Sequence, residues 1–384
     1  MLAASPREAR GGARLPALDA LRGVAILLVL VHHMEGYGAL TWRWPLPLLY
    51  AALKDGGWIG VDLFFVLSGF LVSGLIFREY QRRGTVGLGR FLVRRGLKIY
   101  PAFYLLLATT ILIDAFLQQP TPSEAILREA VFLQNYGPSL WPHTWSLAVE
   151  EHFYLLLALG LYLGSRRTAD AGNPFRPLLA LAPAVALLAL AGRLLTLYLS
   201  PQAFRSVLNP THLRIDSLLF GVVLSYLHHF DGACLERRVS QNRLWLLVLS
   251  LGLLLPAFVL DVHRSVFMRS FGLTGLYLGC GGVLLLSLHG ARSRPAWARP
   301  CLGALAAVGT YSYSIYLWHF PVKVWLAPLL RLSFAPHLSY GPRQIAYLGE
   351  CLVVGIVMGK LVEAPVLALR DRFLPSRSPG LSLK

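Results

Sequence analysis

Long apolar runs recur along almost the whole chain and are separated by short polar segments. Ten of these runs are about 20 residues long, the length that an α-helix needs to cross the hydrocarbon core of a bilayer. The connections between them are too short to form a separate soluble domain. The pattern therefore predicts an all-α, polytopic integral membrane protein, with transmembrane helices at residues 16–35, 57–77, 97–117, 144–164, 177–199, 211–228, 243–260, 271–289, 302–326 and 344–366.

Lysine and arginine residues are divided unequally between the two sides of this predicted bundle. Of the 36, 23 lie in the termini and in the connections on the same side, 8 lie in the opposite connections, and the others lie inside spans. Short loops that are rich in these residues stay in the cytoplasm. We therefore expect cytoplasmic termini, with an N-terminal segment at 1–15, one transmembrane domain at 16–370, and a disordered tail at 371–384 that is rich in Pro, Ser and Arg.

Composition agrees with a membrane protein and excludes several classes. Only 14% of residues are charged, against about 25% in soluble domains. The net charge of +17 could suggest nucleic-acid binding, but no module that stacks on bases or reads a groove accompanies it, and we expect no nucleic-acid partner. The four cysteines show no metal-ligand spacing, and HExxH, Walker A and GxSxG motifs are absent. We therefore expect no metal, and hydrolase classes that depend on those motifs have no support.

Several ionisable side chains fall inside the predicted spans or at their outer ends. An ionisable group at mid-bilayer is unfavourable by at least about 2.5–3.5 kcal/mol, so each needs a partner or a task. Mutual pairing in one cavity open to the outer side would offset their desolvation. We expect such a cavity to contain His33, Asp62, Glu150, Glu151, Arg214, Asp216, His319 and Lys323.

Arg22 and His33 have a spacing that suits a long ligand. Eleven residues bring two helical side chains within about 20° of the same face, about 16 Å apart along the axis. His32 lies about 80° away from that face. A cation near the cytoplasmic end could bind the phosphates of coenzyme A, while the imidazole meets its thioester. Two hydrated histidines at the membrane interface explain the spacing equally well.

Seven motifs, in order along almost the whole chain, resemble the acyltransferase family 3 proteins. Members of that family are membrane acyltransferases that modify lipopolysaccharide, other surface sugars and antibiotics. Arg22 and His33 match the family's Arg-x10-His signature, although Lys98 stands where the family often has arginine. The motifs are LDALRGVAILLVLVHH (18–33), GVDLFFVLSGFLVSGLIF (60–77), RFLVRRGLKIYP (90–101), WSLAVEEHFYLL (145–156), RIDSLLFG (214–221), YSYSIYLWHFPV (311–322) and VEAP (362–365).

The resemblance implies an enzyme of the cell (inner) membrane, in contact with lipid, that acylates a carbohydrate or glycolipid hydroxyl. We expect acetyl-CoA or another acyl-CoA as the donor, with acetyl the expected group. The matched positions and the polar groups described above lead us to three sets of residues. The catalytic set is His33, Arg22, Glu150 and Asp62; the donor-binding set is Arg94, Arg95 and Lys98; and the substrate-binding set is Trp145, Ser146, Ser68, Arg214, Tyr313 and His319.

His33 is our hypothesis for the general base, because imidazole exchanges protons near neutral pH. A two-step route with the acyl group carried on the histidine is the alternative. Glu150 or Asp62 could orient the ring as the acid does in a triad, although the i,i+4 spacing of Glu150 and Tyr154 also favours simple helix packing. The small residues 68, 69, 73 and 74 are typical of close helix packing.

A proton-coupled transporter is the main alternative function, since it too would use ionisable groups within the membrane. Transporters commonly show repeated halves, and we detect no internal repeat. A non-catalytic scaffold is a third reading, which leaves the alignment of Arg22 with His33 without a task.

Overall fold

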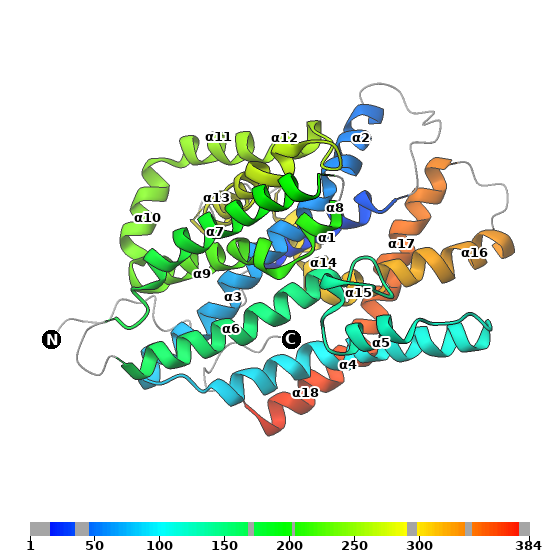
Figure 1. The fold of residues 1–384 in the computed structure, drawn as a ribbon, viewed down its shortest axis with the longest axis horizontal. Helices are drawn as coiled ribbons and strands as arrows, with labels where there is room; N and C mark the ends of the chain where they lie inside the picture. The colour runs from blue at the N-terminus through cyan, green and yellow to red at the C-terminus, as the bar shows by residue number, and fades with distance from the viewer. Residues whose placement is uncertain are drawn as a thin grey trace.

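The computed structural model describes residues 16–34, 46–167, 173–201, 204–289, 298–334 and 340–375, and every regular element in these ranges is helical (Figure 1). This confirms the predicted all-α class. The predicted disordered tail begins at residue 371, but the last helix continues to Phe373. Residues 1–15 and 376–384 lie outside the described residues. The α-helices are α1 (Pro16–His32), α2 (Leu46–Gly56), α3 (Gly60–Arg83), α4 (Leu88–Phe116), α5 (Ser123–Ala130), α6 (Trp145–Arg167), α7 (Leu178–Leu199), α8 (Phe204–Leu208), α9 (Ile215–Phe230), α10 (Gly232–Gln241), α11 (Arg243–Leu254), α12 (Pro256–Val259), α13 (Leu273–His289), α14 (Ala298–Thr310), α15 (Ser312–Pro321), α16 (Ala327–Phe334), α17 (Tyr340–Met358) and α18 (Ala364–Phe373).

Six helical segments in the described ranges are long and apolar enough to cross a membrane. They are Pro47–Arg83, Leu88–Phe116, Trp145–Arg166, Leu178–Leu199, Met268–His289 and Gly341–Phe373. A seventh is added if α9 and α10, which meet at a bend of 107°, form one broken span. The chain is thus an all-α polytopic membrane protein. The count of ten spans and the cytoplasmic position of the termini stay predictions.

Three of the predicted spans correspond to shorter or broken helices. The first is α1, with 17 residues, and the seventh is the apolar stretch Arg243–Val259. The span predicted at 302–326 is broken at Tyr311, between α14 and α15, and ends in a π-helical turn directly after Pro321. Because proline has no N–H to donate, it interrupts the regular hydrogen-bond ladder, and hydropathy alone does not reveal such a break.

The outer faces of several helices are strongly apolar. Exposed large side chains include Leu112 and Phe116 on α4, Leu187 and Leu188 on α7, and Trp245 on α11. An apolar surface of this extent is unfavourable in water and is the surface that lipid chains cover. It supports the assignment of these helices to a bilayer.

Glycines allow two pairs of helices to approach closely. A Cβ on Gly69 of α3 would lie 1.9 Å from the carbonyl oxygen of Leu218 in α9, and one on Gly309 of α14 would lie 1.8 Å from the carbonyl oxygen of Asp19 in α1. Side chains larger than hydrogen are therefore excluded at both contacts. The packing interpretation of the small residues of α3 is correct for Gly69, as in other membrane helix pairs.

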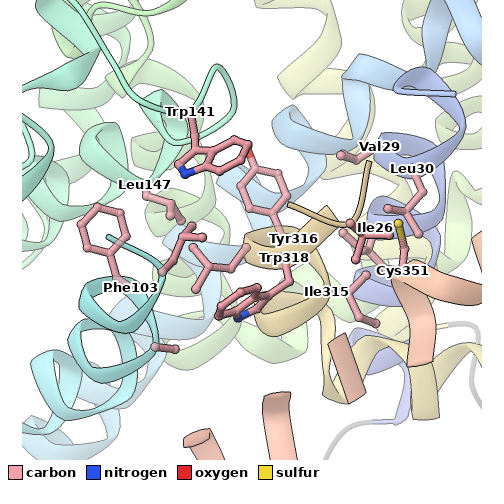
Figure 2. Close-up of a cluster of buried hydrophobic side chains, with 14 of the residues drawn as sticks. Ile26, Val29, Leu30, Phe103, Trp141, Leu147, Ile315, Tyr316, Trp318 and Cys351 are labelled. Carbon is pink, nitrogen blue, oxygen red and sulfur yellow. The ribbon is translucent and has the colours of Figure 1, made fainter. Parts of the chain in front are cut away.

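A buried apolar cluster connects α1, α4, α6, α15 and α17. Figure 2 shows Tyr316 of α15 in its middle, with Trp141 and Leu147 to one side and Val29 and Ile26 of α1 to the other. Ile26 and Val29 are fully buried. This cluster holds α1 against α15 and so sets the relative positions of the polar groups described next.

Candidate functional site

A cavity with a volume of about 200 Å³ lies between α1, α3, α4, α6, α15 and α18. The residues of α3 that line it run from Val61 to Glu79, which corresponds to about 27 Å of helix at 1.5 Å per residue. The cavity is therefore long and narrow, and its length approaches the thickness of the hydrocarbon core of a bilayer.

Basic side chains dominate the polar lining of this cavity. Seven of them line it, against two acidic residues, Glu79 and Glu150. Concentrated charge of one sign in a narrow site with low-dielectric walls attracts ligands of the opposite charge. The cavity therefore suits a polyanion, through Arg22, Arg78, Arg90, Arg94, Arg95, Lys98 and Arg370.

One end of the cavity lies against the C-terminal part of the described chain. Arg94 forms an ion pair with Asp371 at 2.9 Å and donates to the carbonyl oxygen of Leu374. Arg90 donates to the carbonyl oxygen of Pro375, and Arg370 pairs with Asp371 at 2.9 Å. The end of α18 and the two residues after it thus occupy some of the hydrogen-bonding capacity of the cavity's arginines.

Arg95 is the centre of a hydrogen-bonded group in the cavity wall. It donates to the Tyr154 hydroxyl at 2.5 Å, lies 4.0 Å from the centre of that ring, and is 3.4 Å from a Glu150 carboxylate oxygen. Tyr154 in turn donates to Glu150 at 2.6 Å. The hydroxyl of Ser68 is hydrogen-bonded to Tyr154. The predicted i,i+4 contact between Glu150 and Tyr154 is therefore present, and it leaves Glu150 and Ser68 facing the cavity.

Arg22 and Lys98 bring positive charge to the cavity from α1 and α4. Arg22 forms an ion pair with Asp19 at 3.7 Å. Both cations interact electrostatically with Glu363, which accepts a hydrogen bond from Ser314. Glu363 is thus paired within the bundle.

A hydrogen bond joins Ser146 and Tyr316 in the lining of the cavity. Both side chains line it, and their hydroxyls are 2.7 Å apart. The Tyr316 hydroxyl donates to the carbonyl oxygen of His143 at 2.8 Å, so Ser146 is the donor in the shorter bond. Nearby, Tyr313 also lines the cavity and donates to the carbonyl oxygen of Ile99 at 2.8 Å.

Three histidines gather on the other side of Tyr316, and we call them the histidine cluster: His33, His143 and His319. The ring centre of His319 lies 5.0 Å from that of His33 and 4.8 Å from that of His143. Tyr316 lies 5.5 Å from the rings of His143 and His319. The ammonium of Lys323 donates to the backbone carbonyl of His33 at 2.6 Å. Arg22 therefore lines the cavity, whereas His33 does not and belongs to the histidine cluster, which Tyr316 of the cavity wall contacts through His143 and His319.

A backbone carbonyl, and not a carboxylate, orients the His33 ring. Its Nδ1 is 2.9 Å from the carbonyl oxygen of Val29, one turn earlier in α1. Among the described residues, no hydrogen bond joins His33 to Glu150 or Asp62. The triad-like role of these acids stays a prediction; in the structure Glu150 is paired with Arg95 and Asp62 with Arg214.

Asp62 and Arg214 form a buried ion pair with a distance of 2.7 Å. The Arg214 guanidinium also lies over the rings of Phe65 and Trp145, at 5.6 and 5.8 Å. A second buried pair joins Arg193 of α7 to Asp216 of α9. These contacts connect α3, α6, α7 and α9, and the catalytic role of Asp62 and the substrate-binding roles of Arg214 and Trp145 stay predictions.

The expectation of one shared outer cavity is therefore wrong. The charged and polar groups form three assemblies: the cationic cavity, the histidine cluster and the buried ion pairs. Opposite charges pair directly where the dielectric constant is low, and hydropathy gives the depth of a residue but not the direction in which it faces.

Several residues of the site were missed in the sequence. His143 lies two residues before Trp145, and its position beside a predicted outer helix end was the available signal. Burial lowers the pKa of His143, which is in the connection between α5 and α6, to about 3, so its ring is neutral. Tyr316 lies within a recognised motif, but nothing in the sequence marks it as a partition. Arg370 lies in the last helix, and nothing in the sequence around it indicates that it lines the cavity.

No three His, Cys, Asp or Glu side chains in the described part of the chain are placed to hold a metal ion. The four cysteines are free thiols, and Cys280 and Cys351 are buried. The groups available for chemistry are therefore imidazoles, hydroxyls, carboxylates and cations.

A family model described as an acyltransferase domain matches residues 15–359, which confirms the resemblance carried by the motifs. The chain is similar to the peptidoglycan O-acetyltransferase OatA of Listeria monocytogenes, with 24% identity over 92% of this chain and 56% of that protein. It is also similar to the putative peptidoglycan O-acetyltransferase YrhL of Bacillus subtilis (29% identity, 83% of this chain, 50% of that protein) and to the O-acetyltransferase OatA of Staphylococcus aureus (25%, 81% and 51%). The chain thus spans about half the length of these curated relatives. No solved structure matches the chain.

Proposed function

Since this chain belongs to the acyltransferase 3 family, we propose that it is a membrane O-acyltransferase that moves an acetyl group from acetyl-CoA to a carbohydrate hydroxyl. The observation that carries the proposal is the arrangement of the cationic cavity and the histidine cluster on the two sides of Tyr316. A phosphate-bearing donor suits the first, and a proton transfer suits the second.

The shape and charge of the cavity support an extended donor. Coenzyme A carries phosphates at one end and its thioester at the end of a long flexible arm. The arginines near α18 lie on the side that the distribution of Lys and Arg predicts to be cytoplasmic, where acyl-CoA is made. Planar guanidinium groups bind phosphate oxygens in pairs. We assign phosphate binding to Arg90, Arg94 and Arg95, and place the thioester toward Ser146 and Tyr316.

His33 is the proposed general base, with its Nε2 as the reacting atom. A neutral imidazole that donates its Nδ1–H, here toward Val29, keeps its lone pair on Nε2. In the direct route, Nε2 takes the proton of the acceptor hydroxyl while that oxygen attacks the thioester carbonyl. The C–O ester bond forms, the C–S bond breaks, and the proton passes from the imidazolium to the departing thiolate.

The two-step route is also consistent with this geometry. Nε2 then attacks the thioester itself, an acyl-imidazole forms as coenzyme A leaves, and the acceptor hydroxyl takes the acyl group in a second step. Either route brings the thioester from the cavity to His33, which does not line it, past Tyr316, whose ring lies 5.5 Å from those of His143 and His319. We propose that opening of the Ser146–Tyr316 pair precedes acyl transfer.

The acceptor is proposed from the chemistry and from the relatives. Two of the relatives are named peptidoglycan O-acetyltransferases, which makes a glycan of the cell envelope the first acceptor to test. Because those proteins extend well beyond the region matched here, we infer only the class, a carbohydrate hydroxyl, for this chain.

Adjacent histidines provide a matched test. Membranes containing the protein receive acetyl-CoA labelled in the acetyl group, and label on envelope glycans is measured. His33→Ala should reduce transfer by about 10²–10⁴-fold, the usual contribution of a general base. His32→Ala is the control, because the His32 ring is instead hydrogen-bonded to the carbonyl oxygen of Lys54 at 2.7 Å and should keep most activity. Equal loss in both variants, or proton-linked solute uptake without label transfer, would overturn the proposal in favour of packing or transport.

A further inference from the structure

All three rings of the histidine cluster have one nitrogen occupied by a backbone carbonyl. His33 uses Nδ1 toward Val29 at 2.9 Å, His319 uses Nδ1 toward Tyr316 at 2.5 Å, and His143 uses Nε2 toward Leu317 at 3.1 Å. A carbonyl oxygen only accepts hydrogen bonds, so each of these nitrogens carries the proton. In a neutral ring the remaining nitrogen is therefore an acceptor.

Two of those acceptor nitrogens have no donor in the described part of the chain. They are Nδ1 of His143 and Nε2 of His319, and the two residues are 3% and 0% exposed. An unsatisfied buried acceptor is unfavourable by about 1–3 kcal/mol, and native structures contain few of them. Here two belong to rings whose centres are 4.8 Å apart, directly beside His33.

The chemistry of these nitrogens selects a class of ligand. They require donors, which a phosphate, a carboxylate or a thioester does not offer. An ammonium group is disfavoured by the cationic side chain of Lys323 at the backbone of His33. Hydroxyl groups are uncharged donors, and a sugar carries several of them on neighbouring carbons.

We propose that His143 and His319 form a hydroxyl-binding subsite that positions the acceptor beside His33. One or two hydroxyls of an uncharged polyol donate to His143 Nδ1 and His319 Nε2, while a neighbouring hydroxyl gives its proton to His33. His33 is partly exposed, whereas His143 and His319 are buried, so we place the entry of the acceptor at His33. This inference rests on the proposed function, and it makes His143 and His319 positioning residues for the acceptor and not for the donor.

Substitutions by asparagine and by glutamine test the two nitrogens of each histidine ring one at a time. The asparagine amide reaches the position of Nδ1, and the glutamine amide reaches that of Nε2. His143→Gln keeps the bond to Leu317 and loses the acceptor, whereas His143→Asn does the reverse. At His319 the two substitutions exchange roles: His319→Asn keeps the bond to Tyr316, and His319→Gln keeps the acceptor.

The experiment measures label transfer from acetyl-CoA to methyl glucoside by the full-length protein in membranes. We expect His143→Gln and His319→Asn to raise the KM for methyl glucoside by about three- to tenfold, the effect of one hydrogen bond, with the KM for acetyl-CoA unchanged. His143→Asn and His319→Gln, which keep the acceptor but lose the bond to the backbone carbonyl, should raise the KM for methyl glucoside less than the other variant at the same position. Unfolding temperatures in detergent show whether each variant is folded.

Monodeoxy analogues of methyl glucoside provide the second measurement. The analogue that lacks the bound hydroxyl should lose affinity in the unmodified protein and lose nothing further in His143→Gln or His319→Asn, because the same bond is already missing. The reverse ranking of the four variants, or equal loss in all four, would overturn the subsite. Absence of transfer by the unmodified protein would contradict the proposed function, whereas transfer that is indifferent to these variants would contradict the subsite alone.

Discussion

The buried ion pair between Asp62 and Arg214 offers a sharp test of whether Asp62 is catalytic or structural. The two side chains are 1% and 3% exposed and are joined at 2.7 Å. Asp62→Ala would leave the guanidinium of Arg214 without its carboxylate, among the rings of Phe65 and Trp145. Removing one partner of a buried pair typically lowers stability by about 3–5 kcal/mol, a large share of the roughly 5–15 kcal/mol of a typical domain.

Replacing both partners should restore most of that loss. Apolar residues of similar volume in place of a buried pair are often neutral or stabilising, so Asp62→Leu combined with Arg214→Met should unfold close to the unmodified protein. We expect a coupling free energy above about 2 kcal/mol from the double-mutant cycle. Asp261→Ala is the control, because its partner Arg264 is 91% exposed and such pairs contribute about 0–1 kcal/mol.

The assay combines thermal unfolding of the purified protein in detergent with label transfer per folded molecule. A structural Asp62 predicts a low unfolding temperature in Asp62→Ala, with both stability and transfer recovered in the double variant. Asp62→Ala with unchanged unfolding and abolished transfer, together with a double variant that stays inactive, would refute the structural interpretation and restore the catalytic one.

Three further predictions concern the cavity, its end beside α18, and α5. Tyr316→Phe removes the hydroxyl that joins Ser146 to His143. Without an acceptor it should raise the hydrolysis of acetyl-CoA by about three- to tenfold, measured as released acetate. Unchanged hydrolysis would contradict the proposal that Tyr316 controls access from the cavity to the histidine cluster. Asp371→Asn frees Arg94 from its ion pair and should lower the KM for acetyl-CoA by about two- to fivefold, whereas a higher KM would mean that Asp371 helps to position the donor. Burial raises the pKa of Glu129 to about 7, so the folded protein holds a proton that the unfolded chain releases above about pH 4.3. The stability of the folded protein should therefore fall as the pH rises from about 4.3 to about 7. Glu129→Gln should remove this pH dependence, measured as the unfolding temperature.

The all-α class and the apolar spans were predictable, but the rotation of each helix and its partners were not. Apolar runs of sufficient length indicate spans, and the i,i+4 spacing of Glu150 and Tyr154 predicted a contact that the structure contains. The spacing of Arg22 and His33 placed them on one side of α1, but it could not show that Arg22 lines the cavity while His33 contacts His319. That arrangement depends on contacts between helices far apart in the sequence.

Mutual pairing of the ionisable groups was predictable, but the individual partners were not. An ionisable group in the membrane needs a partner or a task, and Asp62 was a candidate for both. Its partner, Arg214, lies 152 residues away in the chain, and nothing in the sequence singles out this pair among the ionisable groups of the spans. His143 was overlooked because one histidine near a helix end is unremarkable until two others are seen beside it.

The two halves of the proposed site are connected through one face of α6. Ser146 and Glu150 are one helical turn apart, so both face the cavity. Glu150 is held by Arg95, and Ser146 holds Tyr316. Under the proposed function, a donor phosphate bound to Arg95 would compete with Glu150, and we expect this competition to weaken the contact between Ser146 and Tyr316.

Such a connection predicts non-additive effects of two substitutions. Glu150→Gln, which removes the charge that Arg95 holds, should raise acceptor-independent acetyl-CoA hydrolysis, as Tyr316→Phe does. The two together should raise it little further, because each releases the same partition, whereas independent sites give effects that multiply. A double variant with the full product of the single effects would show that donor binding and the opening at Tyr316 are uncoupled, and the passage of the acyl group would then depend on thermal opening of the Ser146–Tyr316 pair alone.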